Sequence, residues 1–360
     1  MKIDLKLPIL LGVLAVIAGL LSLTFERPFM TYSQWGYRGT GMAQVYSAKT
    51  IAKNDAANVM PAPQDAVTQS GKKASEVYQN VKVLGDLDEN EFSRLMAAIT
   101  EWVSPEQGCA YCHGESGNFA EDKLYTKVVA RRMLQMTQDI NANWKTHVQQ
   151  TGVTCYTCHR GNNVPANIWF NNEPGGSVAG SMAPKVNGQN TPVKAVAYSS
   201  LPYDFGTNFL EQDNNIRVAA TTALPDYGPG ETGPSIQRTE YTYGLMMHMS
   251  SSLGVNCTYC HNTRNFRGWD GVPPQRVTAW HGIRMVRTLN TGYLDPLKSA
   301  YVEQATNRLG VNGDAPKLNC ATCHQGAFKP LNGASMVKDY PALAPATAAK
   351  VAYTPENAAR

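Results

Sequence analysis

The sequence of 360 residues has no cysteine to spare, because all eight fall within four copies of one short motif. We therefore expect neither a structural disulfide nor a lipid-bearing N-terminal cysteine. Basic runs interleaved with aromatic residues are also missing, which argues against nucleic-acid binding. Hydrophobic residues make up 43% of the chain, an ordinary value for a globular protein, so a polytopic membrane protein is excluded.

The recurring motif is Cys-x-x-Cys-His, the attachment signature of c-type haem. Its two thiols add to the porphyrin vinyl groups, and the histidine binds the iron. A single copy might instead be a redox dithiol or half of a zinc site, but zinc sites need cysteines in paired knuckles, and these pairs are far apart. The sequence thus predicts four covalently bound haem c groups on Cys109, Cys112, Cys155, Cys158, Cys257, Cys260, Cys320 and Cys323, with iron bound by His113, His159, His261 and His324.

The N-terminus holds an uncharged, largely apolar run from Leu7 to Phe25, preceded by Lys2 and Lys6. Such a run is long enough to cross a bilayer as a helix, and the lysines would keep the N-terminus cytoplasmic. A cleaved signal peptide is the alternative, but no convincing small-x-small cleavage site follows Ser22. We therefore predict a transmembrane anchor over residues 1–25 and a periplasmic location for the remainder, since haem is attached to such motifs outside the cytoplasm.

The predicted fold is mainly α with long irregular loops. Hydrophobic periodicity indicates helices over 86–103, 124–148, 236–253 and 275–294, the first with Asp88 as cap and Glu91 three residues on. A weak repeat pairs Arg132-Met133 with Arg284-Met285 and suggests two dihaem halves related by a pseudo-twofold axis. The predicted segments are an anchor (1–25), an extended arm (26–75), a first dihaem half (76–165), a linker region (166–235), a second dihaem half (236–335) and a flexible tail (336–360).

The second axial ligand decides what each haem can do, because a six-coordinate haem transfers electrons and an open one binds small ligands. Met96, Met133 and Met246 lie on helices expected before a motif, where each can present its thioether to an iron. Met133 and His147 would lie roughly 21 Å apart on one helix and so serve two different haems. The repeat nominates Met285 for the fourth haem. Of the other histidines outside the motifs, His281 is a further candidate, and His248 is discounted because it would be turned about 200° from Met246.

Several longer strings resemble one family, the tetrahaem cytochrome c subunit of the purple-bacterial photosynthetic reaction centre. They include Ala98-Ile-Thr-Glu-Trp-Val-Ser-Pro105, Val128-Val-Ala-Arg-Arg-Met133 and Gly282-Ile-Arg-Met-Val-Arg287. The resemblance implies the axial pairs Met96 with His113, Met133 with His159, Met246 with His261, and His147 with His324. One departure is that several family members carry a lipid on an N-terminal cysteine, which this chain lacks.

The resemblance also implies a function and partners. Electrons would pass from a soluble periplasmic cytochrome c or similar donor to the photo-oxidised bacteriochlorophyll special pair, with the light and medium chains of the reaction-centre core as neighbours. We expect an electron carrier without substrate turnover, anchored at the periplasmic face of the photosynthetic membrane. The alternative is a membrane-anchored respiratory tetrahaem cytochrome that relays electrons to a terminal reductase. A multihaem reductase would need a five-coordinate haem.

Overall fold

The computed structural model describes residues 6–25, 30–35, 41–171, 193–216, 236–303 and 307–348. Over these ranges the chain is mainly helical with long irregular loops, as predicted, and has one antiparallel two-stranded sheet. The strands are β1 (Met30–Trp35) and β2 (Met42–Ser47). The helices are α1 (Lys6–Ser22), α2 (Ala48–Ala57), α3 (Ala74–Val77), α4 (Glu89–Val103), α5 (Ala110–His113), α6 (Tyr125–Asn143), α7 (Lys145–Val148), α8 (Cys155–His159), α9 (Ile236–Leu253), α10 (Gln275–Leu289), α11 (Lys298–Glu303) and α12 (Cys320–His324).

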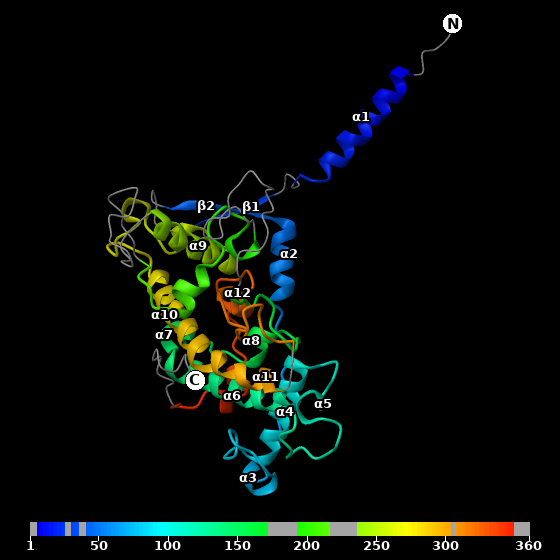
Figure 1. Ribbon diagram of the computed structural model, residues 1–360, viewed down its shortest axis with the longest axis vertical. Coiled ribbons are helices and arrows are strands. Elements are labelled where there is room, and N and C mark those ends of the chain that lie inside the picture. The colour runs from blue at the N-terminus through cyan, green and yellow to red at the C-terminus, as the bar shows by residue number, and fades with distance from the viewer. Residues whose placement is uncertain are drawn as a thin grey trace.

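The elements are stacked along one long axis (Figure 1). Helix α1 projects from one end, where β1, β2 and α9 lie. Helices α12 and α8 follow in the middle, and α4, α5 and finally α3 lie towards the opposite end. The motif-bearing helices α12, α8 and α5 are thus distributed along the molecule rather than gathered at one point.

The segment predicted as a transmembrane anchor contains helix α1. This helix has 17 residues and ends at Ser22, whose hydroxyl donates to the Gly19 carbonyl at 2.7 Å, while Thr24 donates to Leu21 at 2.7 Å. Within the described ranges no helix is long and apolar enough to cross a membrane.

The predicted extended arm is folded rather than extended over much of its length. It contains the β1–β2 hairpin and α2, and side chains tie both to distant parts of the chain. The Tyr46 hydroxyl donates to the Gly254 carbonyl at 2.6 Å, and the Met42 amide donates to the hydroxyl of Thr258 at 2.9 Å. The hairpin therefore packs against the segment that carries the third motif.

Two hydrophobic clusters form the core of the described residues. The larger one joins α6, α9 and α10 with residues of the predicted linker region, namely Val196, Phe205, Phe209 and Leu210. The smaller one joins Leu95 and Trp102 of α4 with Tyr340 and Leu343, which are 3% and 0% exposed. Parts of the predicted linker and tail are therefore buried core, because their few apolar side chains cover helix faces that would otherwise meet water. Residues 172–192, 217–235 and 349–360 of these two segments lie outside the described residues.

The predicted helices occur close to their expected bounds, with one break. Asp88 caps α4 by accepting from the Asn90 amide, although Glu91 pairs with Arg94 instead of completing a capping box. The stretch 124–148 is two helices, because α6 ends before Trp144 and α7 is a separate turn. His147 therefore does not lie on the same helix as Met133, and the expected spacing of roughly 21 Å along one axis is wrong.

Candidate haem sites

Each Cys-x-x-Cys-His motif forms a single helical turn. The second and fourth motifs are α8 and α12, the first overlaps α5, and the third begins with the 3-10 turn Cys257–Tyr259. Short polar residues start three of these turns: Thr154, Asn256 and Asn319 occupy the capping positions. In helical geometry residues three and four apart share a face, so both thiols and the histidine are presented on the same side of the turn.

The four motif histidines share one hydrogen-bond arrangement. In each, Nδ1 donates to a backbone carbonyl three to six residues further along the chain: His113 to Phe119 (3.1 Å), His159 to Asn162 (2.8 Å), His261 to Phe266 (2.9 Å) and His324 to Ala327 (2.9 Å). A proton fixed on Nδ1 leaves Nε2 with its lone pair free, which is the tautomer and orientation that a metal-binding imidazole needs. Sequence reasoning named these histidines but did not find the carbonyls that orient them.

Two versions of this arrangement alternate along the chain. In the first and third motifs the accepting carbonyl belongs to a phenylalanine whose ring also lies against the imidazole, with centroids 4.8 Å apart for Phe119 and 4.5 Å for Phe266. In the second and fourth motifs the next residue, Arg160 or Gln325, adopts the left-handed helical conformation, and the carbonyl comes three residues after the histidine. The local geometry thus repeats in motif pairs one-three and two-four.

His147 lies opposite the histidine of the fourth motif. Its ring centroid is 6.1 Å from that of His324, and its Nδ1 donates to the Thr278 carbonyl of α10 at 2.9 Å. Two imidazoles on opposite sides of one metal ion have centroids about 6 Å apart, because each metal–nitrogen bond is about 2 Å long. Burial, with a further contribution from His147, lowers the pKa of His324 to about 4, so this ring stays neutral as a ligand must.

The predicted methionine ligands are less closely defined. Met96, Met133 and Met246 are each half-buried on α4, α6 and α9. One turn beyond Met96, the Thr100 hydroxyl lies 3.9 Å from the Cys109 sulfur, so this face of α4 is turned towards the first motif. The alternative ligand Met285 is 7% exposed and belongs to the larger hydrophobic cluster.

The other two histidines are not brought to a motif by any contact among the described residues. His248 is buried, donates from Nδ1 to the Ala195 carbonyl at 2.7 Å and stacks on Phe205. His281 packs against the neighbouring Trp280 ring. Among the described residues, His147 is the histidine outside the motifs that has a ring contact with a motif histidine.

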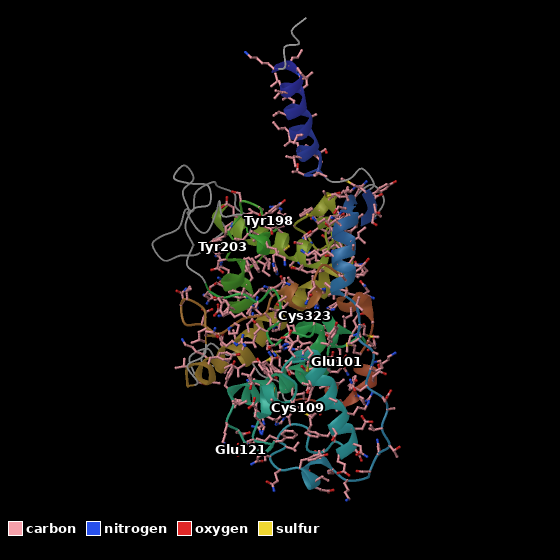
Figure 2. The ribbon with its side chains drawn as sticks, turned by 90° about the vertical axis from the view of Figure 1, so that its right-hand side faces the viewer. Glu101, Cys109, Glu121, Tyr198, Tyr203 and Cys323 are labelled. Atoms are coloured by element: carbon pink, nitrogen blue, oxygen red, sulfur yellow. The ribbon has the colours of Figure 1, made fainter. Side chains whose placement is uncertain are left out.

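The second and fourth motifs meet in the middle of the molecule. The Cys158 and Cys323 sulfurs are 2.8 Å apart, and Arg160 donates from Nη2 to the Cys323 carbonyl at 3.2 Å. Cys323 lies near the middle of the long axis, whereas Cys109 of the first motif lies towards the end away from α1 (Figure 2). Sequence reasoning gave no order for the motifs in space, and this contact between chain-distant cysteines makes the second and fourth motifs neighbours.

The donor set fits haem c better than zinc. Two thiols and one histidine meet at each motif, and within the described ranges no group of three or more His, Cys, Asp or Glu side chains is arranged to hold a metal ion. Burial raises the pKa of Cys155 and of Cys320 to about 12, so both are present as thiols. The residues present therefore suit a porphyrin that bonds to both sulfurs and brings its own iron.

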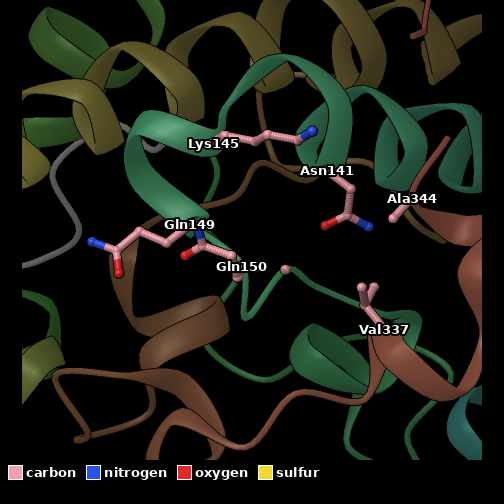
Figure 3. Close-up of a pocket in the computed structure, with 7 residues that line it drawn as sticks. Asn141, Lys145, Gln149, Gln150, Val337 and Ala344 are labelled. Atoms are coloured by element: carbon pink, nitrogen blue, oxygen red, sulfur yellow. The ribbon is translucent and has the colours of Figure 1, made fainter. Parts of the chain in front are cut away.

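A separate open pocket of about 360 Å³ lies beside α7 (Figure 3). It is lined by Asn141, Lys145, Gln149, Gln150, Gly152, Val337 and Ala344. None of the predicted haem-binding residues lines it, and the Asn141 amide is already occupied by the Val153 and Leu343 carbonyls. This pocket is therefore not part of the candidate haem sites.

A buried ionic cluster precedes the fourth motif. Lys317, whose side chain is 1% exposed, pairs with Asp314 at 2.7 Å and with Asp295 at 3.7 Å. Burial, together with the charges of Glu211 and Asp314, raises the pKa of Asp295 to about 6 despite the opposing effect of Lys317. Folding therefore penalises the charged form of this carboxyl group.

We expect Asp295→Asn to raise the thermal unfolding midpoint by a few degrees at pH 8 and to leave it unchanged near pH 4. Since the folded-state pKa lies above that of the unfolded chain, the native protein binds more protons between about pH 4 and 6 and loses stability as pH rises through that window. Circular dichroism melts of both proteins at several pH values measure this difference. Asp270→Asn, at an exposed aspartate, is the control and should shift neither value; an equal gain at both pH values for Asp295→Asn would contradict the assignment.

Comparison with known proteins identifies the family of this chain. The family described as photosynthetic reaction centre cytochrome C subunit matches residues 26–344. A photosynthetic reaction center cytochrome c subunit from Rubrivivax gelatinosus is 52% identical over 95% of this chain and 91% of its own length. Proteins of the same description from Thermochromatium tepidum and Roseobacter denitrificans are 48% and 42% identical, over 91% and 93% of this chain and 78% and 92% of their own lengths. The chain therefore belongs to the family of photosynthetic reaction centre cytochrome c subunits.

Proposed function

We propose that this chain, an electron-transfer subunit of the photosynthetic reaction centre and not an enzyme, binds four haem c groups, one at each motif. Covalently bound haem c belongs to the cytochrome c family; the number four is our inference. The observation that carries it is the common orientation of His113, His159, His261 and His324, each with Nδ1 held by a carbonyl. When bound, haem supplies a reversible one-electron Fe(III)/Fe(II) couple.

We further propose the axial pairs Met96 with His113, Met133 with His159, Met246 with His261 and His147 with His324. The last pair is supported by the 6.1 Å between the two ring centroids and by the hydrogen bond that occupies Nδ1 of His147 and leaves its Nε2 free. The burial of Met285 in the hydrophobic cluster favours His147 over that alternative. With these side chains as ligands, no iron would keep an open position for water or a small molecule, which suits electron transfer. Reduction of a substrate would need an open position.

The alternating geometry of the motifs supports an arrangement of two dihaem halves related by a pseudo-twofold axis. The contact between Cys158 and Cys323 would lie where the halves meet. Arg160 adds a half-buried positive charge at this junction, since it donates to the Cys323 carbonyl and also to the Ala57 carbonyl at 2.8 Å. A fixed cation beside two redox centres favours their reduced forms and so raises their potentials.

For partners, we propose a soluble periplasmic cytochrome c or similar donor and, as acceptor, the photo-oxidised bacteriochlorophyll special pair held by the light and medium chains. The periplasmic face of the photosynthetic membrane is the corresponding location. Family membership of nearly the whole chain supports this proposal over the respiratory relay, which would use the same haem chemistry with another acceptor.

Flash spectroscopy on membranes of the source organism tests the proposed acceptor. With the haems reduced beforehand, one actinic flash should oxidise a haem, seen in its α-band, at the same rate at which the special pair is re-reduced. A silent haem band in membranes with an active reaction centre would instead support the respiratory relay. The pyridine haemochrome of the purified protein independently gives the haem count, and fewer than four per chain would contradict the occupancy of all motifs.

A further inference from the structure

A glycine in the middle of α10 faces the ring of His147. A methyl group at Gly282 would lie 2.5 Å from Cε1 of His147, 2.8 Å from Nδ1 and 3.2 Å from Nε2. Ordinary carbon–carbon contacts are about 3.5–4.0 Å, so the ring and a side chain at this position cannot both be where the structure has them. The ring of His147 thus occupies the space that any other residue at 282 would fill.

The same glycine gives His147 its hydrogen-bond acceptor. In an α-helix the carbonyl of residue i lies beside residue i+4, so the side chain at 282 would cover the carbonyl of Thr278. His147 donates to this carbonyl at 2.9 Å. Glycine weakens a helix interior relative to alanine, and Gly282 carries no positive φ that would require it. The close contact with the imidazole therefore explains why position 282 is a glycine, whereas helix stability does not explain it.

We infer that Gly282 is a positioning residue for the fourth haem: it allows the His147 ring to lie flat on α10, bound to Thr278, at the depth from which Nε2 reaches the iron opposite His324. This inference rests on the proposed pairing of His147 with His324. The ring is held between two fixed neighbours, α10 behind it and the ring of His324 6.1 Å in front. A methyl group at 282 has to push the ring out of line by roughly 1 Å, because a 2.5 Å contact must lengthen to ordinary van der Waals distance.

The test is carbon monoxide binding and redox titration of purified, full-length, haem-loaded Gly282→Ala protein. The wild-type protein should not bind carbon monoxide when reduced, whereas the variant should bind it at one haem and show a raised midpoint for that haem alone. Gly206→Ala is the matched control, because a methyl group there would meet the Trp169 ring at 2.8 Å without touching His147. That variant should have the four midpoint potentials of the wild-type protein and should not bind carbon monoxide.

A second experiment removes the clash altogether. In His147→Gly the missing ring should be replaceable by added imidazole, which restores the low-spin spectrum of one haem. Adding Gly282→Ala to this background should raise the imidazole dissociation constant about tenfold or more, since the methyl group occupies part of the ring's space. If Gly282→Ala alone fails to fold, the double variant should fold, because nothing then opposes the methyl group.

The outcomes separate this inference from the ligand assignment. If His147→Gly binds carbon monoxide while Gly282→Ala behaves as wild type and leaves imidazole affinity unchanged, the positioning role is overturned and the ligand assignment stands. If His147→Gly itself binds neither carbon monoxide nor imidazole, the pairing of His147 with the fourth haem is wrong, and this inference is wrong with it.

Discussion

His147→Met is expected to raise the midpoint potential of one haem, on the order of 100 mV, and to leave the other three in place. Methionine is a weaker donor than imidazole and favours Fe(II), so the proposed His/His haem would become a Met/His haem. Its unbranched, flexible side chain can follow the path of the imidazole towards His324. An equilibrium redox titration that follows the α-band resolves the four potentials, and the lowest should move.

Two matched variants separate ligand loss from local disturbance. His281→Gln changes a histidine near His147 that has no contact with a motif histidine, and should leave all four potentials unchanged. Met285→Leu keeps the volume of a buried side chain and should cost little stability and no potential shift. A shift in Met285→Leu together with unchanged potentials in His147→Met would assign the fourth haem to Met285.

Met96→His is expected to lower the midpoint of one haem, again on the order of 100 mV. Imidazole stabilises Fe(III) more than a thioether does, so the proposed first haem would acquire the character of the His147/His324 pair. Met96 can be exchanged in this way because it is half-buried, on the face of α4 where Thr100 lies 3.9 Å from the Cys109 sulfur. The same redox titration reads the result.

The comparison variant is Met136→Leu, at a buried methionine of α6 that belongs to the larger hydrophobic cluster. It should change stability slightly and no midpoint. Four unchanged midpoints in Met96→His would mean that Met96 is core packing, as methionines on apolar helix faces commonly are, and would leave the first haem without its proposed second ligand.

Local chemistry was readable along the chain because it depends on neighbours in sequence. The spacing of Cys257, Cys260 and His261 predicts the attachment motif, and Asp88 before a periodic apolar stretch predicts the start of α4, which the structure confirms. The single helix expected over 124–148 is two helices, since α7 packs on α10 and the chain turns at Trp144 to allow it. Apolar periodicity continues across such a turn, so the pattern alone did not reveal the break.

The predicted tail and linker were misread for a related reason. Val196 and Leu343, both 0% exposed, stand in stretches with no helical or strand period, so composition made them look like loop. Their burial comes from single apolar side chains placed against helices that are distant in sequence. The apolar run continues to Phe25, whereas helix α1 ends at Ser22, where the hydroxyls of Ser22 and Thr24 donate to carbonyls of the last turn.

The sequence by itself determined the covalent chemistry of this protein: which cysteines and histidines can hold haem, and through longer strings, which family the chain belongs to. Only the tertiary structure decided that Cys158 meets Cys323 and that Gly282 meets the ring of His147. It also gave the 6.1 Å between the rings of His147 and His324, a pair that the family resemblance had implied without any geometry. The physical reason is that a thioether-forming motif is complete within five residues, whereas a second axial ligand and the contact between motifs depend on where separately formed helices pack. Those positions follow from the burial of apolar surface over the whole chain, which no local pattern encodes.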